Sequence, residues 1–398
     1  MQDSIWFRTL TDDERKPFER TDELPHSSEV VIVGAGMVGL ATAYYLTQAG
    51  VKDICIVERG TPLGEASGAN AGGLWFAQES IEPGPVAELN KATSQLYDQL
   101  GEEFSFDLRR PGMLELLYSE DDVQKAPARV ERLHAAGFRA EHLERDQMRA
   151  LEPSLGTTAV GALHYPDEGH LHPAKLASAL IQSLRSRGVR ICTGVEVDDL
   201  SSGVVTSQGP IDAKTTIVTA GSWTPLLTRT LRWEPLIRPI RGTLLAVGPL
   251  EKTLTHTITA KEFYFTQLTT GHIVGGGSLD DVGFRRGVDP DTTARIRAEM
   301  KELVPATADL PTSCAWSGFR PYCEGMKPVI GAVPGRERMF VAAGHYRKGI
   351  MQSPITGKII ADLVTTGKTD LPVDAFAPGR FPLGVSSVPL DAGAKQQR

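Results

Sequence analysis

The pattern of hydrophobic and polar residues changes period twice near the start of the chain. Residues 30–33 (VVIV) are consecutive β-branched apolar residues, which is typical of a buried strand in a parallel sheet. Residues 41–50 (ATAYYLTQAG) predict a helix that ends at its last glycine, and residues 53–58 (DICIVE) predict a second short strand. The order of strand, glycine-rich turn, helix and strand predicts a βαβ unit of an α/β fold.

The turn between the first strand and the helix carries Gly34, Gly36 and Gly39 in the spacing GxGxxG. The first glycine allows a tight turn, the second lets a pyrophosphate approach the backbone, and the third lets the helix sit close to the strand. The helix N-terminus offers free N–H groups to the phosphate charge. Glu58 ends the second strand at about the spacing, roughly 20 residues, of an acid that binds ribose hydroxyls. The unit predicts a dinucleotide site; the alternative is a glycine-rich turn of an unrelated α/β protein.

A second glycine-rich segment, residues 64–74 (GEASGANAGGL), follows soon after Glu58. Such a loop brings N–H donors close to a ligand, and Ser67 and Asn70 add side-chain hydrogen bonds. A nicotinamide leaves the site after turnover and needs no second loop, whereas a flavin stays and has a long linker to hold. The segment therefore favours FAD over NAD, with a flexible surface loop as the alternative.

Further along the chain, the patterns predict a mixture of strands and helices. Residues 238–247, 262–278 and 280–286 show the alternating or apolar patterns of antiparallel strands. Pro173 favours the first turn of a helix, and His170 and His172 precede it. A His-x-His pair suggests a metal, but no third ligand is in register, so no metal site is predicted.

Composition and charge limit the classes of function. The chain has 398 residues, an apolar fraction of 41% and a net charge of −7, which argues against nucleic-acid binding because phosphate needs a basic face. The four cysteines show no CxxC pair and are expected to be reduced thiols of a cytoplasmic protein. Residues 1–27 lack the apolar region of a signal peptide, and glycines interrupt the longest apolar run, so no transmembrane span is expected. Association with the surface of an inner membrane stays open.

Five motifs in order resemble one family of flavoproteins. After GxGxxG with Glu58 come ASGANAGGL (66–74), IVTAGSWT (217–224), WSGFRP (316–321) and GHYRKGIMQSPITGKIIADL (344–363). Together they resemble the FAD-dependent D-amino-acid oxidase/dehydrogenase superfamily, which includes glycine oxidase, sarcosine oxidase and D-amino-acid dehydrogenase. The resemblance extends from about residue 28 to about residue 370, nearly the whole chain.

The resemblance implies an α/β fold with a Rossmann-like FAD-binding domain and an inserted α+β substrate domain on a large mixed or antiparallel sheet. An N-terminal extension and a loose C-terminal tail are expected outside these domains. The expected ranges are 28–80, 155–225 and 322–375 for FAD binding, 81–154 and 226–321 for substrate binding, 1–27 for the extension and 381–398 for the tail.

The resemblance also implies which residues face the substrate. Arg320 is expected to hold a substrate carboxylate, since its planar fork matches a carboxylate and is always charged; an interdomain salt bridge is the alternative. Tyr264 is expected to cover the substrate, with a core strand aromatic as the alternative. His345 and Arg347 are expected to line the active-site side of the late turn. Many members have a proline and an arginine after the aromatic; this chain has neither, which leaves the substrate's identity open.

The cofactor is expected to be FAD held without a covalent bond. Cys314 and Cys323 flank the region where some relatives attach the flavin, but neither is at a matching position. Val195 is expected on the adenine side, the Gly349–Met351 turn is expected to precede a helix, and Lys348 is expected to be solvated. The expected cofactor residues are Gly34, Gly36, Met37, Val38, Gly39, Glu58, Arg59, Ser67, Asn70, Ala71, Gly72, Val195, Ala220, Gly221, Trp223, Gly344, Tyr346, Lys348, Gly349 and Ile350.

The resemblance implies an enzyme that oxidises the C–N bond of a small amino acid by hydride transfer to flavin N5. The candidate substrates are a D-amino acid, glycine, sarcosine or a cyclic imino acid, and the product imine would hydrolyse to a keto acid. Oxygen, a quinone or a protein could accept the electrons, and an oligomer is left open. Two alternatives remain: an FAD-bearing subunit of a multi-protein amine dehydrogenase, and an NAD(P)H-dependent flavin monooxygenase or reductase.

Overall fold

The computed structural model describes residues 3–80 and 82–384, which form two large sheets. Strands β18 to β8 of the first sheet are parallel, as the apolar run at residues 30–33 predicts. The first sheet contains, in spatial order, β17 (Val329–Ala332), β18 (Met339–Ala343), β11 (Gly209–Val218), β1 (Ser27–Val33), β2 (Ile54–Glu58) and β8 (Arg190–Thr193), with β10 (Val204–Thr206) and β9 (Val197–Asp199) attached to β11.

The strand order of this sheet reverses beside β1. The chain leaves β1 through helix α3 (Met37–Gln48) toward β2 and later returns to the other side of β1 as β11. Loops that follow two such strands diverge, and they leave a crevice at the carboxyl ends of the strands, where α/β folds bind their ligands. The GxGxxG turn follows β1 into this crevice.

The second sheet is mixed. All of its neighbouring strands are antiparallel except the pair β13 and β4. It contains, in spatial order, β16 (Thr312–Cys323), β12 (Ile237–Val247), β15 (Ile273–Gly276), β14 (Tyr264–Gln267), β13 (Thr257–Thr259), β4 (Met113–Leu117), β6 (Gly161–Tyr165) and β5 (Glu141–Glu144). A short ladder joins β3 (Gly73–Leu74) to β7 (Gly169–His170). This arrangement confirms the expected fold class.

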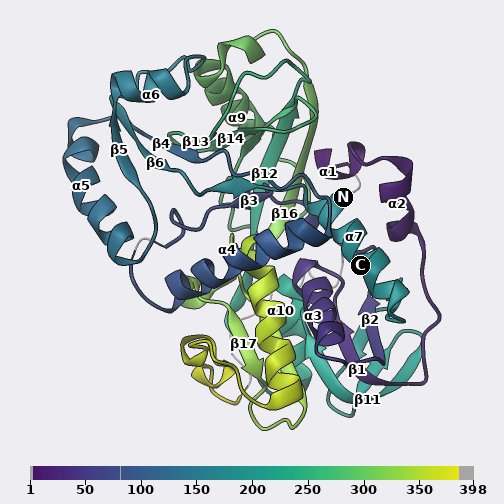
Figure 1. Cartoon of the computed structure of the whole chain (residues 1–398). Coiled ribbons are helices and arrows are strands. Elements are labelled where there is room, and N and C mark those ends of the chain that lie inside the picture. The colour runs from purple at the N-terminus through teal and green to yellow at the C-terminus, as the bar shows by residue number, and fades with distance from the viewer. Residues whose placement is uncertain (1–2, 81, 385–398) are drawn as a thin grey trace.

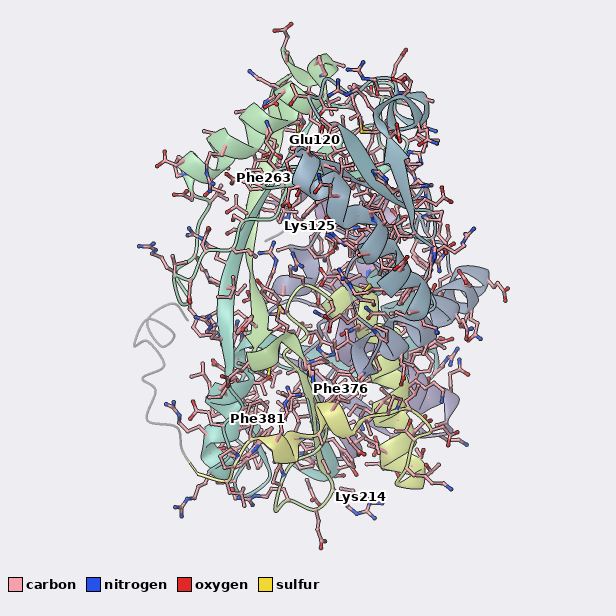
Figure 2. The ribbon with its side chains drawn as sticks, turned by 90° about the vertical axis from the view of Figure 1, so that its left-hand side faces the viewer. Glu120, Lys125, Lys214, Phe263, Phe376 and Phe381 are labelled. Atoms are coloured by element: carbon pink, nitrogen blue, oxygen red, sulfur yellow. The ribbon has the colours of Figure 1, made fainter. Side chains whose placement is uncertain are left out.

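Helices cover both sheets. They are α1 (Ile5–Arg8), α2 (Asp12–Glu19), α4 (Pro85–Glu103), α5 (Glu120–Ala135), α6 (Arg145–Leu151), α7 (Pro173–Ser186), α8 (Thr224–Thr228), α9 (Pro290–Leu303) and α10 (Gly349–Thr366), in addition to α3. Figure 1 shows α3 and α10 with β1, β2 and β11 in the lower lobe, and α5, α6 and α9 in the upper lobe. In Figure 2, Phe263 lies in the upper lobe and Phe376 and Phe381 lie in the lower lobe. None of the described helices combines the length and the apolar composition needed to cross a bilayer.

One strand falls outside the domain range expected for it. Residues 155–225 were assigned to FAD binding, but residues 161–165 form β6 of the second sheet, between β4 and β5. Its side chains Ala162, Leu163 and Tyr165 are buried in that sheet's core, which the sequence pattern alone does not assign to either sheet. The rest of the domain division stays a prediction.

Both ends of the described chain pack against the body of the protein. In the expected extension, α1 buries Trp6 and Phe7 and α2 buries Phe18, and all three belong to one hydrophobic core cluster with residues of α3 and α7. The expectation of a loose tail is wrong for Phe381, whereas residues 382–384 are exposed. Phe381 is buried, and its carbonyl accepts a hydrogen bond from Trp233 Nε1 at 3.3 Å. The remaining residues, 385–398, lie outside the described residues.

The two histidines before Pro173 have protein partners. His170 Nε2 lies 3.0 Å from the Arg109 guanidinium. His172 is the N-cap of α7, and its Nδ1 accepts a hydrogen bond from the Lys175 N–H at 3.2 Å. Its Nε2 lies 3.0 Å from Thr9 Oγ1, whose own proton is donated to a carbonyl of α1. These bonds require the neutral ring, and burial lowers the pKa of His172 to about 4.

Substituting His172 tests this capping role. The folded state holds the pKa of His172 below its unfolded value, so the stability that the neutral ring contributes is lost as the pH falls below about 6.5. His172→Asn keeps a capping acceptor and removes the titrating group. Between pH 7.5 and pH 5.5, the wild-type free energy of unfolding should fall by about 1 kcal/mol more than that of the variant. Urea unfolding at both pH values measures this, and equal losses would contradict the assignment.

Candidate active site

A cavity of about 590 Å³ extends from the crevice at β1 to the second sheet. One end is lined by Gly34 and Gly36, and the other by Tyr264 and Arg320. Segments 63–78, 219–230 and 342–350 form much of the wall between these ends. The cavity therefore connects the predicted dinucleotide turn to the residues expected to bind a substrate.

The GxGxxG turn is built for close approach of the backbone. Gly34 has a φ of 112°, and a Cβ there would lie 2.9 Å from the Thr219 carbonyl oxygen at the end of β11. A Cβ on Gly39 would lie 2.0 Å from the Gly34 carbonyl oxygen, so the third glycine lets α3 begin against the strand. Gly36 lies at the cavity with no side chain to fill it. This cradle fits a pyrophosphate at the N-terminus of α3.

Glu58 lies at the cavity in the position expected for the ribose-binding acid. Its two carboxylate oxygens accept hydrogen bonds from the Ala35 and Gly60 N–H groups, each at 2.9 Å, which fixes the carboxylate. Burial raises its pKa. The neighbouring Arg59 pairs with Glu65 at 2.7 Å and lies 4.0 Å from the centre of the Trp223 ring, so it forms a wall of the cavity.

One side of the second glycine-rich segment, residues 64–74, lines the cavity. Ser67 accepts a hydrogen bond from the Met37 N–H at 3.0 Å and thereby caps α3. The Asn70 amide bonds the Ser67 carbonyl and the Gly72 N–H, so it holds the shape of the loop. A Cβ on Gly72 would lie 2.4 Å from the Leu171 carbonyl oxygen, which places this glycine on the side away from the cavity.

Most of the expected cofactor residues line this one cavity. Those that do are Gly34, Gly36, Val38, Glu58, Arg59, Ser67, Asn70, Ala71, Val195, Ala220, Gly221, Trp223, Gly344, Tyr346, Gly349 and Ile350. Met37, Gly39, Gly72 and Lys348 do not line it. Gly39 and Gly72 instead let neighbouring backbone segments pack closely, and the Met37 N–H donates a hydrogen bond to Ser67. Cys314 and Cys323 lie outside this lining, and the absence of a covalent bond to the flavin stays a prediction.

Arg320 carries a positive charge that no acid within residues 3–80 and 82–384 neutralises by an ion pair. It extends from β16 across Gly242 of β12, where a Cβ would lie 2.0 Å from its guanidinium. One nitrogen donates to the Ser278 carbonyl at 2.6 Å, and no carboxylate in the described part of the chain lies within ion-pair distance. The nearby Asp280 is already paired with Arg241. Burial lowers the pKa of the Arg320 guanidinium.

Tyr264 stands beside Arg320 at the same end of the cavity. Gly277 makes room for it, since a Cβ there would lie 3.0 Å from the tyrosine ring. Trp75 packs edge-on against the ring with a centroid distance of 4.7 Å. Burial raises the pKa of Tyr264, which keeps its hydroxyl protonated as a donor.

The turn between β18 and α10 is fixed to the end of β16. The Tyr346 N–H donates to the Pro321 carbonyl at 2.9 Å, and Tyr346 takes a left-handed φ of 52°. His345 is buried, with Nε2 2.9 Å from Thr356 Oγ1, and burial lowers its pKa to about 3, so the ring is neutral. This turn therefore places His345 and Arg347 at the cavity beside Arg320.

The expectation that Lys348 is solvated is wrong. Its side chain is 5% exposed, and its ammonium lies 3.6 Å from Glu79, whose side chain is 8% exposed. The same carboxylate lies 2.8 Å from the Arg347 guanidinium. Lys348 lies behind the cavity wall because Glu79 pairs with it there. Glu79 is distant in sequence, so the residues near the turn do not predict this pairing.

Helix α10 starts earlier than its sequence suggests. It begins at Gly349, so Gly349–Met351 form its first turn and do not precede it. Pro354 argues against a helix here because it has no N–H for the Ile350 carbonyl. That carbonyl accepts hydrogen bonds from Tyr97 Oη at 2.6 Å and from Ser353 Oγ at 2.8 Å. The positive end of the helix therefore lies directly at the cavity, where Gly349 and Ile350 line it.

Sequence reasoning missed the residues that support the site from behind. Glu168 is 1% exposed and accepts hydrogen bonds from three consecutive N–H groups, those of residues 76–78. This fixes the segment that carries Trp75, Gln78 and Glu79. Gly242 and Gly277 interrupt strand patterns, so the sequence could have indicated a close approach at these positions. No such pattern indicates that Glu79 and Glu168 are buried.

Comparison with known proteins identifies the family. The sequence model of the family described as "DAO: FAD dependent oxidoreductase" matches residues 29–363. The chain belongs to this family. It is therefore an FAD-dependent oxidoreductase, and the expectation of FAD is confirmed. The roles of single residues stay predictions.

Individual relatives align with this DAO-family enzyme over most of its length. Glycine oxidase of Bacillus licheniformis is 27% identical over 84% of this chain and 92% of its own. Hydrogen cyanide synthase subunit HcnC of Pseudomonas aeruginosa is 26% identical over 89% of this chain and 96% of its own. The crystal structure of glycine oxidase from Geobacillus kaustophilus superposes with a TM-score of 0.84 at 27% identity, covering 92% of this chain and 100% of the other.

The buried pair Glu79 and Lys348 gives a test of the support behind the cavity. Glu79→Gln leaves the Lys348 ammonium buried without an acid, which should lower the free energy of unfolding by about 3 kcal/mol. Adding Lys348→Met should restore most of that loss, because the unpaired charge is removed. Urea unfolding at one fixed FAD concentration measures both. Equal stability of the single and double variants would show that the pair does not carry this energy.

Proposed function

We propose that this DAO-family enzyme oxidises the C–N bond of a small amino acid whose carboxylate binds Arg320. The observation that carries the proposal is the unneutralised guanidinium at the end of the cavity that begins at the FAD cradle. A cation left without an acid in a partly buried site is suited to an anionic ligand. Relatives named glycine oxidase support an amino acid as that ligand.

Arg320 and Tyr264 would hold the substrate. The Arg320 fork can donate two parallel hydrogen bonds to a carboxylate, and the Tyr264 hydroxyl can donate a further one. Trp75 and Tyr264 both line the cavity and pack edge-on against each other, so two bulky rings occupy space at this end, which favours a small substrate. Two bonds from a planar group set the direction of the α-carbon as well as its position.

Bound FAD supplies the two-electron acceptor for the hydride of the substrate α-carbon. The residues of the chain supply orientation and charge. The positive end of α10 and the cations Arg320 and Arg347 favour negative charge in the cavity. His345 is neutral and bonded to Thr356, so it adds no charge. The amine must be neutral to release the hydride, and the resulting imine then takes up water to give a keto acid. Ammonia is released from a primary amine and methylamine from sarcosine, whereas the nitrogen of a cyclic imino acid stays attached to the product.

One relative favours a second candidate, an FAD-bearing subunit of a multi-protein dehydrogenase. Hydrogen cyanide synthase subunit HcnC carries the word subunit in its name and matches 89% of this chain. In this case the electrons would pass to a quinone or to a partner protein instead of oxygen. Activity with an artificial dye but not with oxygen would support the second candidate.

An anaerobic screen of amino acids tests the proposed reaction. D-amino acids, glycine, sarcosine and cyclic imino acids are mixed one at a time with the FAD-loaded protein, and the flavin absorbance is followed. At least one should bleach the flavin and yield its keto acid in equal amount. Bleaching by NADPH together with no response to any amine would overturn the proposal.

Arg320 gives the sharper test of the site. Arg320→Ala should raise the KM for the amino acid about 100-fold, since a charge-assisted bidentate contact contributes roughly 2–3 kcal/mol. FAD affinity should stay unchanged. Arg238→Ala is the matched control, because Arg238 lies on the neighbouring strand, is exposed and pairs with Asp281. Steady-state kinetics measure both, and an unchanged KM in Arg320→Ala would remove Arg320 from the substrate site.

A further inference from the structure

The N-terminal segment, residues 3–26, lies before the match to the family model, which begins at residue 29. Even so, its side chains reach the loop that lines the cavity. Helix α1 carries Trp6 and Phe7, which are 0% and 3% exposed. Both contact the glycine-rich segment 64–74, here called the flavin loop, from its outer side.

Trp6 bonds and packs against the flavin loop. Its Nε1 donates a hydrogen bond of 2.8 Å to the Asn70 carbonyl. Its ring lies so close to Gly72 that a Cβ there would be 3.2 Å from the ring edge. The ring also packs edge-on against His172, with a centroid distance of 5.2 Å. The tryptophan therefore fills the space between the flavin loop and α7.

Phe7 makes the second contact. A Cβ on Gly68 would lie 3.0 Å from the Phe7 ring, so the loop passes the phenyl group without a side chain of its own. The opposite side of the same loop lines the cavity through Ala66, Ser67, Ala69, Asn70 and Ala71. One short loop thus has FAD-facing residues on its inner side and the N-terminal segment on its outer side.

The segment is fixed at its far end as well. The Asp22 carboxylate lies 3.0 Å from Arg185 of α7 and accepts the Ile191 N–H at 2.9 Å. Thr21 Oγ1 accepts the Thr193 N–H at 2.9 Å. These bonds fasten the segment to α7 and to the edge strand β8. Trp6 is consequently held against the flavin loop by contacts on both sides.

We propose that the N-terminal segment positions the flavin loop for FAD, with Trp6 as the positioning residue. A loop rich in glycine loses much conformational freedom when it is ordered, which would weaken ligand binding. Contacts that order the loop before the ligand arrives remove part of this cost. The inference rests on the FAD dependence of the family and not on the amino acid proposed as substrate.

Trp6→Phe tests the inference while keeping an aromatic ring in the core. The variant loses the hydrogen bond to the Asn70 carbonyl, and we expect the Kd of the full-length apoprotein for FAD to rise about tenfold. Trp6→Ala should raise it further. Hydrogen exchange of the peptide covering residues 64–74 should be faster in apo Trp6→Phe than in the wild-type apoprotein.

Trp233→Phe is the matched control. Trp233 is also 0% exposed, its Nε1 donates to the Phe381 carbonyl, and it lies outside the cavity lining. This variant should lose thermal stability as Trp6→Phe does, with an unchanged Kd for FAD. If both variants lose stability while both keep the wild-type Kd and loop exchange, the segment has only a structural role and the inference is overturned.

Discussion

The positive charge of Arg320, which has no ion-pair partner among the residues that the structure describes, is the constraint on which the arrangement of the cavity depends. A partly buried guanidinium is costly unless something neutralises it, and within the described part of the chain its one hydrogen bond goes to the Ser278 carbonyl. Gly242 provides the space for it, and the antiparallel pair β12 and β16 holds it at the end of the cavity. In the proposed function a substrate carboxylate would supply the missing charge, and the same cavity begins at the turn after β1, where the glycines leave room for the pyrophosphate of FAD.

The cavity walls around this charge are held by a series of contacts that begins at residues far from Arg320. Glu168 fixes the backbone of residues 76–78, Glu79 on that segment pairs with Arg347 and Lys348, and these two lie on the turn beside α10. On the other side, Trp6 holds the flavin loop from outside. Cofactor and substrate ends are thus joined through buried polar contacts, which are sensitive to the removal of a single partner.

Local sequence rules predicted the parts of the site that local geometry determines. The GxGxxG turn, Glu58 and the flavin loop follow from glycine spacing and strand ends, and the structure places them around one cavity. Lys348 could not be placed correctly, because its burial depends on Glu79, which is distant in sequence. Likewise, the start of α10 depends on Tyr97, which satisfies the carbonyl that Pro354 leaves free. Such long-range partners carry no periodic signal.

A titration of the FAD-loaded protein with acetate, followed by the visible absorbance of the flavin, tests the central claim most directly. Acetate has a carboxylate and no amine to oxidise, so it reports binding alone. We expect a saturable change of the flavin spectrum in the wild-type protein and no such change in Arg320→Met over the same concentration range. An equal response in both proteins would contradict the claim that Arg320 receives the carboxylate beside the flavin.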